Sequence, residues 1–137
     1  MTAPAVLAAG DRAAPLRVVG PVSAVETESG WWITARVPIT ADDPHTAAHF
    51  PGAPVFPGVF LIEGVGQAVA GGTGLPTRTT AVERARFTAP VVPGDVVRFD
   101  VVVTTTGSGW AVRADVVREA DGTPVAQVRL RLEAEVA

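Results

Sequence analysis

The sequence predicts an α+β fold in which an antiparallel six-stranded sheet wraps around one central apolar helix. Two groups of β-branched segments, each bounded by turn signals, flank the single helical segment Pro57–Gly71. That segment is apolar nearly all round, so the strands are expected to enclose it. The 137 residues suffice for one domain, and we expect a flexible tail at 1–14 and the domain at 15–137.

The first group of segments is typical of an antiparallel hairpin. Leu16–Glu28 is rich in Val, and residues alternate between polar and apolar in Trp31–Ile39. The turn signals Gly107-Ser108-Gly109 and Asp121-Gly122 lie in the second group, and the Asp-Gly pair favours a two-residue turn. The four strands of this group are expected in meander order: Ala81–Pro90, Asp95–Thr106, Trp110–Glu119 and Pro124–Val136.

The composition excludes several function classes. A formal net charge of −3 with 47% hydrophobic residues argues against disorder and against a nucleic-acid-binding charge pattern. The absence of Cys excludes disulfides, thiolate nucleophiles and thiolate metal sites. The apolar start of the chain is short for a secretory signal, and no apolar run is long enough for a membrane span. A cytoplasmic location is expected.

Glu63 is the ionisable residue of the predicted helix. A buried carboxylate is costly unless it is protonated or hydrogen-bonded, and Gln67 follows one helical turn later, within reach of it. One interpretation is a polar seam with a purely structural role. The other is a carboxylic acid whose burial raises its pKa, ready to donate a proton.

A rigid loop precedes this helix. It begins at His49, and its prolines and glycines exclude regular helix or strand there. A histidine held in such a loop can act as a base near neutral pH. Gly58, at the start of the helix, offers a backbone N–H that could polarise a carbonyl oxygen. The loop residues are Pro51, Gly52, Pro54, Pro57 and Gly58.

A metal site that includes His49 is a weaker alternative. His45 and His49 are four residues apart, and Glu63 could be a third ligand, but Thr46 occupies the position where a zincin-type motif has Glu. We therefore expect no metal and no redox cofactor.

The segment from His49 to Gln67 resembles the signature of the 3-hydroxyacyl-acyl-carrier-protein dehydratases of the FabZ type. A weaker similarity covers Ala85–Asp95. An acidic residue of the Glu type at position 63 is nearer to FabZ than to FabA, which has Asp there and also isomerises. The matching residues are His49-Phe50-Pro51-Gly52, Pro54, Pro57-Gly58-Val59, Glu63 and Gln67.

The resemblance implies a hot-dog fold and a homodimer in which His49 of one subunit meets Glu63 of the other. By analogy His49 takes the α-proton and Glu63 assists departure of the β-hydroxyl as water. The Gly58 N–H binds the thioester oxygen, the Val55 carbonyl orients His49, and Gln67 holds Glu63. The implied reaction is dehydration of (3R)-hydroxyacyl thioesters to trans-2-enoyl thioesters, in fatty-acid or polyketide synthesis.

The resemblance also implies a substrate site and a partner. Phe50 and Phe56 are expected to contact the substrate, which is carried by acyl carrier protein or CoA. Because the carrier is acidic, Arg78, Arg84 and Arg86 are candidates for its docking, although they could equally be solvated strand charges. The dimers could assemble further into a trimer of dimers.

Two rival functions fit the same fold. The first is another hot-dog enzyme, either an enoyl-CoA hydratase or a thioesterase. Asp43, which precedes His49, is consistent with the hydratase alternative. The other is a catalytically silent subunit that binds an acyl chain or a partner protein. The retention of both His49 and Glu63 argues against the silent subunit.

Overall fold

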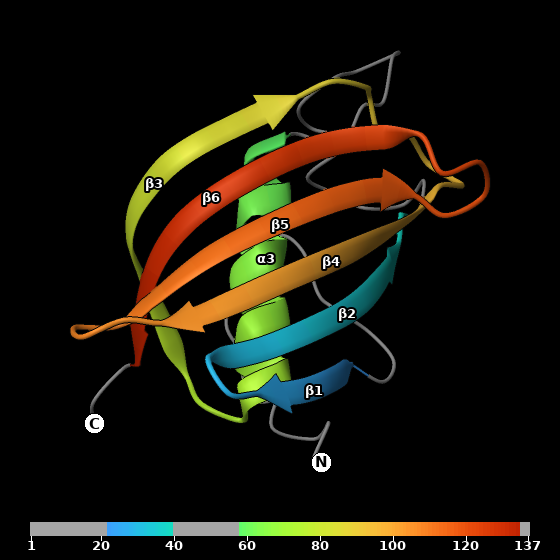
Figure 1. The fold of residues 1–137 in the computed structure, drawn as a ribbon. Helices are drawn as coiled ribbons and strands as arrows, with labels where there is room; N and C mark the ends of the chain where they lie inside the picture. The colour runs from blue at the N-terminus through green and yellow to red at the C-terminus, as the bar shows by residue number, and fades with distance from the viewer. Residues whose placement is uncertain (1–21, 40–57, 135–137) are drawn as a thin grey trace.

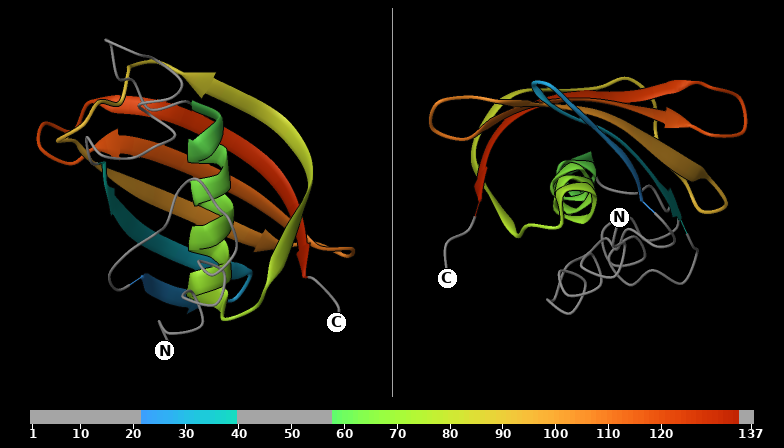
Figure 2. Two further views of the ribbon diagram at one scale, coloured as in Figure 1. Left: turned by 180° about the vertical axis from the view of Figure 1, so that it is seen from behind. Right: turned by 60° about the horizontal axis from the view of Figure 1, so that its bottom comes forward.

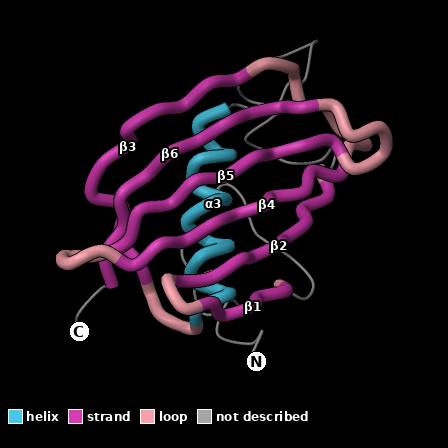
Figure 3. The backbone as a smooth tube through the Cα atoms, viewed as in Figure 1, coloured by secondary structure: helices cyan, strands magenta, loops and turns pink. Residues whose placement is uncertain are grey.

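Six strands form one antiparallel sheet that curves around helix α3 in the computed structural model, which describes residues 22–39 and 58–134 (Figure 1). The predicted tail at 1–14 lies outside these residues. Two strands precede the helix and four follow it, as the tube in Figure 3 traces. In chain order the elements are β1 (Ser23–Thr27), β2 (Gly30–Pro38), α3 (Gly58–Thr73), β3 (Thr77–Phe87), β4 (Val96–Thr105), β5 (Trp110–Arg118) and β6 (Pro124–Ala134).

The predicted N-terminal hairpin is confirmed as the pair β1–β2. Along β2 the side chains of Ile33, Ala35 and Val37 are buried, while Trp32 and Arg36, on the opposite face of the strand, are exposed. This alternation follows from the two-residue period of a strand, and it gives the sheet a buried inner face and a solvent-exposed outer face.

The order of the strands differs from the prediction in one place. The sheet runs β1-β2-β4-β5-β6-β3, so β4, β5 and β6 form a meander but β3 pairs with β6 at the far edge. The last turn of α3 lies near β1 and β2, and the chain then crosses to the far edge, forms β3 there and returns to β4 beside β2. The predicted four-strand meander is therefore wrong, because strand order depends on the path that the chain takes after the helix. Strand β3 also starts earlier than predicted, at Thr77.

The two predicted turns behave differently. At Gly107–Gly109 the chain reverses tightly, with the Thr106 N–H donating to the Gly109 carbonyl at 2.7 Å. At the other turn only Gly122 has a positive φ, of 71°. Its N–H donates to the Arg118 carbonyl at 2.8 Å, and the Arg118 N–H donates to the Thr123 carbonyl at 2.9 Å. The predicted two-residue hairpin turn is therefore wrong, and the loop is longer.

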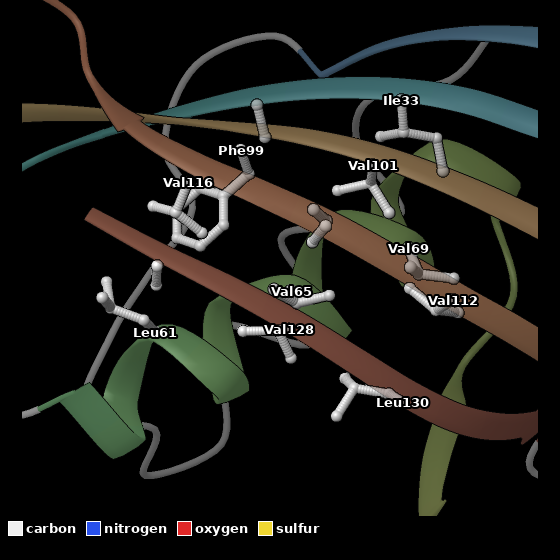
Figure 4. Close-up of a cluster of buried hydrophobic side chains, with 14 of the residues drawn as sticks. Ile33, Leu61, Val65, Val69, Phe99, Val101, Val112, Val116, Val128 and Leu130 are labelled. Carbon is white, nitrogen blue, oxygen red and sulfur yellow. The ribbon is translucent and has the colours of Figure 1, made fainter. Parts of the chain in front are cut away.

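Helix α3 lies along the concave face of the sheet (Figure 2). It begins and ends close to the predicted Pro57–Gly71, and the buried residues on one side of it meet alternating strand residues such as Phe99 and Leu130 (Figure 4). Among the described residues no helix is both long enough and apolar enough to cross a membrane. The buried side chains of the helix are Leu61, Val65, Gln67, Ala68 and Val69.

Candidate active site on helix α3

Gly58 is the first residue of α3 and lies against Phe87, the last residue of β3. A Cβ placed on Gly58 would come within 2.9 Å of two ring carbons of Phe87, so any larger residue here would have to displace the ring or the helix start. The first N–H groups of a helix have no partner within it, and the helix dipole favours negative charge there. The backbone at Gly58 can therefore stabilise a developing oxyanion.

Phe87 lies in the segment Ala85–Asp95 and was not predicted as a site residue. It ends β3, and its side chain is 47% exposed although it is large and apolar. A ring of this size beside an open helix end forms an apolar wall next to the Gly58 amide.

Glu63 is exposed, which corrects the expectation of a helix with no solvent-facing side. The sheet curves around only part of α3 (Figure 2). Glu63 makes no hydrogen bond or ion pair with any other described residue. It is the ionisable side chain of the helix and projects from the side that the sheet leaves uncovered.

Gln67, one turn later, is buried with 5% of its surface exposed, and it is the buried polar residue of the described core. Positions four apart on a helix are rotated by about 40°, so the two residues lie at the border between the covered and the open side. The predicted role of Gln67 in holding Glu63 stays a prediction.

The other predicted site residues lie outside the described residues. These are His49, the predicted base, and the residues expected to orient it or to contact substrate: Phe50, Val55 and Phe56. The histidine pair considered as a metal site, His45 and His49, lies there as well. The structure therefore places Gly58, Glu63 and Gln67 on one helix and leaves the proposed meeting of His49 with Glu63 as a prediction.

The three arginines predicted for partner docking do not share one environment. Arg78 forms an ion pair with Glu133 on the neighbouring strand β6. Arg84 and Arg86 have exposed side chains and form no ion pair with another described residue. Arg84 lies directly opposite Arg129 of β6, and this juxtaposition could not be predicted from the sequence because it depends on strand order.

The architecture of one antiparallel sheet wrapped around a central helix is the hot-dog fold, and solved structures agree. The dehydratase heterocomplex ApeI:P from Xenorhabdus doucetiae superimposes with a TM-score of 0.70 at 15% identity, over 90% of this chain and 86% of that one. The PaaI protein from the phenylacetic acid degradation operon of E. coli gives a TM-score of 0.60 at 15% identity, over 85% and 80%. At these identities the likeness concerns the fold alone.

The model of the FabA-like domain matches residues 12–129, so the chain belongs to the FabA-like domain family. Among curated relatives, the 3-hydroxyacyl-[acyl-carrier-protein] dehydratase FabZ of Rhizobium etli is 40% identical over 97 residues, 65% of this chain and 61% of that protein. The same enzyme of Sinorhizobium medicae is 41% identical over 98 residues, 65% and 62%. The match thus spans about three fifths of the length of these relatives.

Proposed function

We propose that the protein dehydrates (3R)-hydroxyacyl thioesters to trans-2-enoyl thioesters, as a hydro-lyase without metal or redox cofactor. The observation that carries the proposal is the placement of Glu63 on the open side of α3, five residues after the Gly58 amide. Relatives named for this reaction support it. Five residues of helix correspond to a rise of about 7.5 Å, enough for one helix to serve two parts of a short substrate.

The proposed reaction divides among three groups. His49 removes the α-proton, and the electrons of that C–H bond form the new double bond. The β-carbon–oxygen bond breaks as Glu63 donates a proton to the hydroxyl, which leaves as water. During proton removal the thioester oxygen gains negative charge, and the Gly58 N–H stabilises it. In this scheme the Val55 carbonyl orients His49, and Gln67 positions Glu63.

We propose further that the enzyme is a homodimer in which His49 of one protomer meets Glu63 of the other. Apolar surface beside the helix supports a second copy as its cover. Val82 pairs with buried Leu130, so it lies on the inner face of β3, yet 50% of it is exposed. Phe87 on the same strand is 47% exposed. A partner over this region would remove Glu63 from water and enclose it in the shared site.

The proposed substrate is bound to acyl carrier protein or to CoA, in fatty-acid or polyketide synthesis. Phe50 and Phe56 are proposed to contact it. We also propose that the protein acts in the cytoplasm and that three dimers assemble into a trimer of dimers.

The test is to supply the purified protein with 3-hydroxyacyl thioesters of several chain lengths, on carrier protein and on CoA, and to follow products by mass spectrometry. Loss of one water, giving the enoyl thioester, is expected. Release of free acid would instead indicate a thioesterase. Binding without any product, at every chain length and on both carriers, would indicate a silent acyl-binding subunit.

A further inference from the structure

The arginines of the described residues divide into two groups. Five of them form ion pairs, at positions 36, 78, 98, 118 and 131. The other four, Arg84, Arg86, Arg113 and Arg129, form none with any residue that the structure describes. All four are exposed and lie on the neighbouring strands β3, β5 and β6. The arginines that lack an ion pair among the described residues thus lie together on three neighbouring strands.

Three of these arginines form a single row across the sheet. Arg113 is directly opposite Arg129, and Arg129 is directly opposite Arg84. Like charges in directly opposite positions repel and lower the stability of a sheet. Arg84, Arg113 and Arg129 line a hollow of about 220 Å³ together with Asp115 and Gln127. Asp115 forms no ion pair with these arginines. An arrangement that costs folding energy, and whose three arginines form no ion pair with a described residue, fits an external anionic partner.

Beyond Arg113 the row continues across the sheet into apolar residues. Val102 is opposite Arg113, and Trp32 is opposite Val102. Trp32 is 62% exposed, which is unusual for so large an apolar side chain. Adjacent strands are about 4.8 Å apart, and one helical turn rises about 5.4 Å. A partner helix lying across the strands would therefore present about one residue per turn to each strand.

We infer that this outer row, from Trp32 through Arg113 and Arg129 to Arg84, docks an acidic helical face of the acyl carrier protein that presents the substrate. This inference rests on the proposed function. Arg86 and Phe87 are successive residues of β3, the first exposed beside the row and the second against Gly58. Because β3 ends at Phe87 and Phe87 lies against Gly58, a flexible acyl arm tethered near Arg86 has a short path around the end of the strand to the helix N-terminus.

The test compares the triple variant R84Q/R113Q/R129Q with wild type on three forms of one 3-hydroxyacyl group. These are the carrier-bound thioester, the CoA thioester and the N-acetylcysteamine thioester, which has neither protein nor phosphate. The matched control is R131Q, because Arg131 is exposed on the same strand as Arg129 but is ion-paired with Glu83 at 2.9 Å.

We expect the triple variant to raise KM for the carrier-bound thioester about tenfold, since three exposed ion pairs are lost, with kcat and both small substrates unaffected. R131Q should leave all three substrates unchanged. An unchanged KM for the carrier-bound thioester would overturn the inference. An equal rise for the CoA thioester would also overturn it, because the row would then bind a phosphate. A loss on every substrate would overturn it as well, indicating damage to the fold or the site.

Direct binding separates this inference from the proposed function. Carrier protein without its prosthetic arm is titrated into each variant, with tryptophan fluorescence as the readout and salt concentration as a variable. Binding that weakens in the triple variant and in high salt supports docking, even if wild type dehydrates nothing. Equal binding by the wild type and the triple variant would overturn docking, even if dehydration is confirmed.

Discussion

Gly58 and Phe87 meet at the point where the end of β3 touches the start of α3, with ring carbons 2.9 Å from the position of a Cβ on Gly58. The contact fixes the first turn of the helix against the sheet edge. It therefore sets where the backbone N–H proposed to bind the thioester oxygen will point.

Gly58→Ala is expected to lower kcat by about tenfold to a hundredfold, because the added methyl displaces the helix N-terminus from Phe87 and misplaces the N–H. Removing the ring in Gly58→Ala/Phe87→Ala should recover part of the loss relative to Gly58→Ala alone. Steady-state kinetics on a small thioester checks both variants. Full activity in Gly58→Ala would show that the position of this amide is not critical.

Leu61→Ala is expected to reduce the free energy of unfolding by about 2–5 kcal/mol, because it leaves a cavity between α3 and the sheet. Leu61 is 1% exposed, whereas Leu75, just after the helix, is 43% exposed. Leu75→Ala makes the same chemical change and should cost less than about 0.5 kcal/mol. Urea unfolding of both variants measures the difference, and equal costs would contradict this description of the core.

Val82→Glu is expected to dissociate the proposed dimer and to abolish turnover, because it places a charge on the apolar inner face of β3 that the second copy would cover. Val25→Glu is the matched control: Val25 is 60% exposed and pairs with exposed Trp32 on the outer face. Sedimentation and turnover of a small thioester provide the readouts. A dimeric, active Val82→Glu enzyme would place the interface elsewhere.

Glu119 joins β2 to β4 through ion pairs with Arg36 and Arg98. Hydrogen bonding from Arg36 lowers the pKa of the Glu119 carboxyl below its ordinary value of 4.5. Since the folded-state pKa is depressed, the stabilisation is present above pH 4.5 and is lost as pH falls through the folded-state value.

Glu119→Gln should therefore lower the urea midpoint at pH 7, and the difference from wild type should narrow at pH 3. Glu28→Gln removes an exposed carboxylate that has no described ion-pair partner, and it should change neither midpoint. A difference for Glu119→Gln that is the same at both pH values would argue against the ion pairs as its source.

The sequence was sufficient to predict what depends on local pattern. The hairpin β1–β2 follows from alternation around Trp32, and α3 begins and ends within two residues of the limits that Pro57 and Gly71 suggest. The place of β3 beside β6 was not predictable, since it depends on how the chain returns after crossing the concave face. The row of Arg84, Arg113 and Arg129 was missed for the same reason, because it requires the register of three strands.

Glu63 shows a different limit. Apolar residues around the helix suggested complete burial, but in one protomer the sheet covers only part of it and Glu63 is exposed. An apolar stretch of sequence has the same pattern whether its residues are buried by the same chain or by a second copy. The pattern is thus consistent with a second copy over this side of α3, and this is the premise of the shared active site.

Complementation between two inactive variants tests that central claim most directly. His49→Ala and Glu63→Gln should each be dimeric and without activity, because each removes one proton-transfer group from both sites. After the two are unfolded together and refolded, half of the dimers are mixed. Each mixed dimer has one intact site, which gives about a quarter of wild-type dehydration. A mixture no more active than its components, or substantial activity in either variant alone, would contradict a site built from His49 and Glu63 of different protomers.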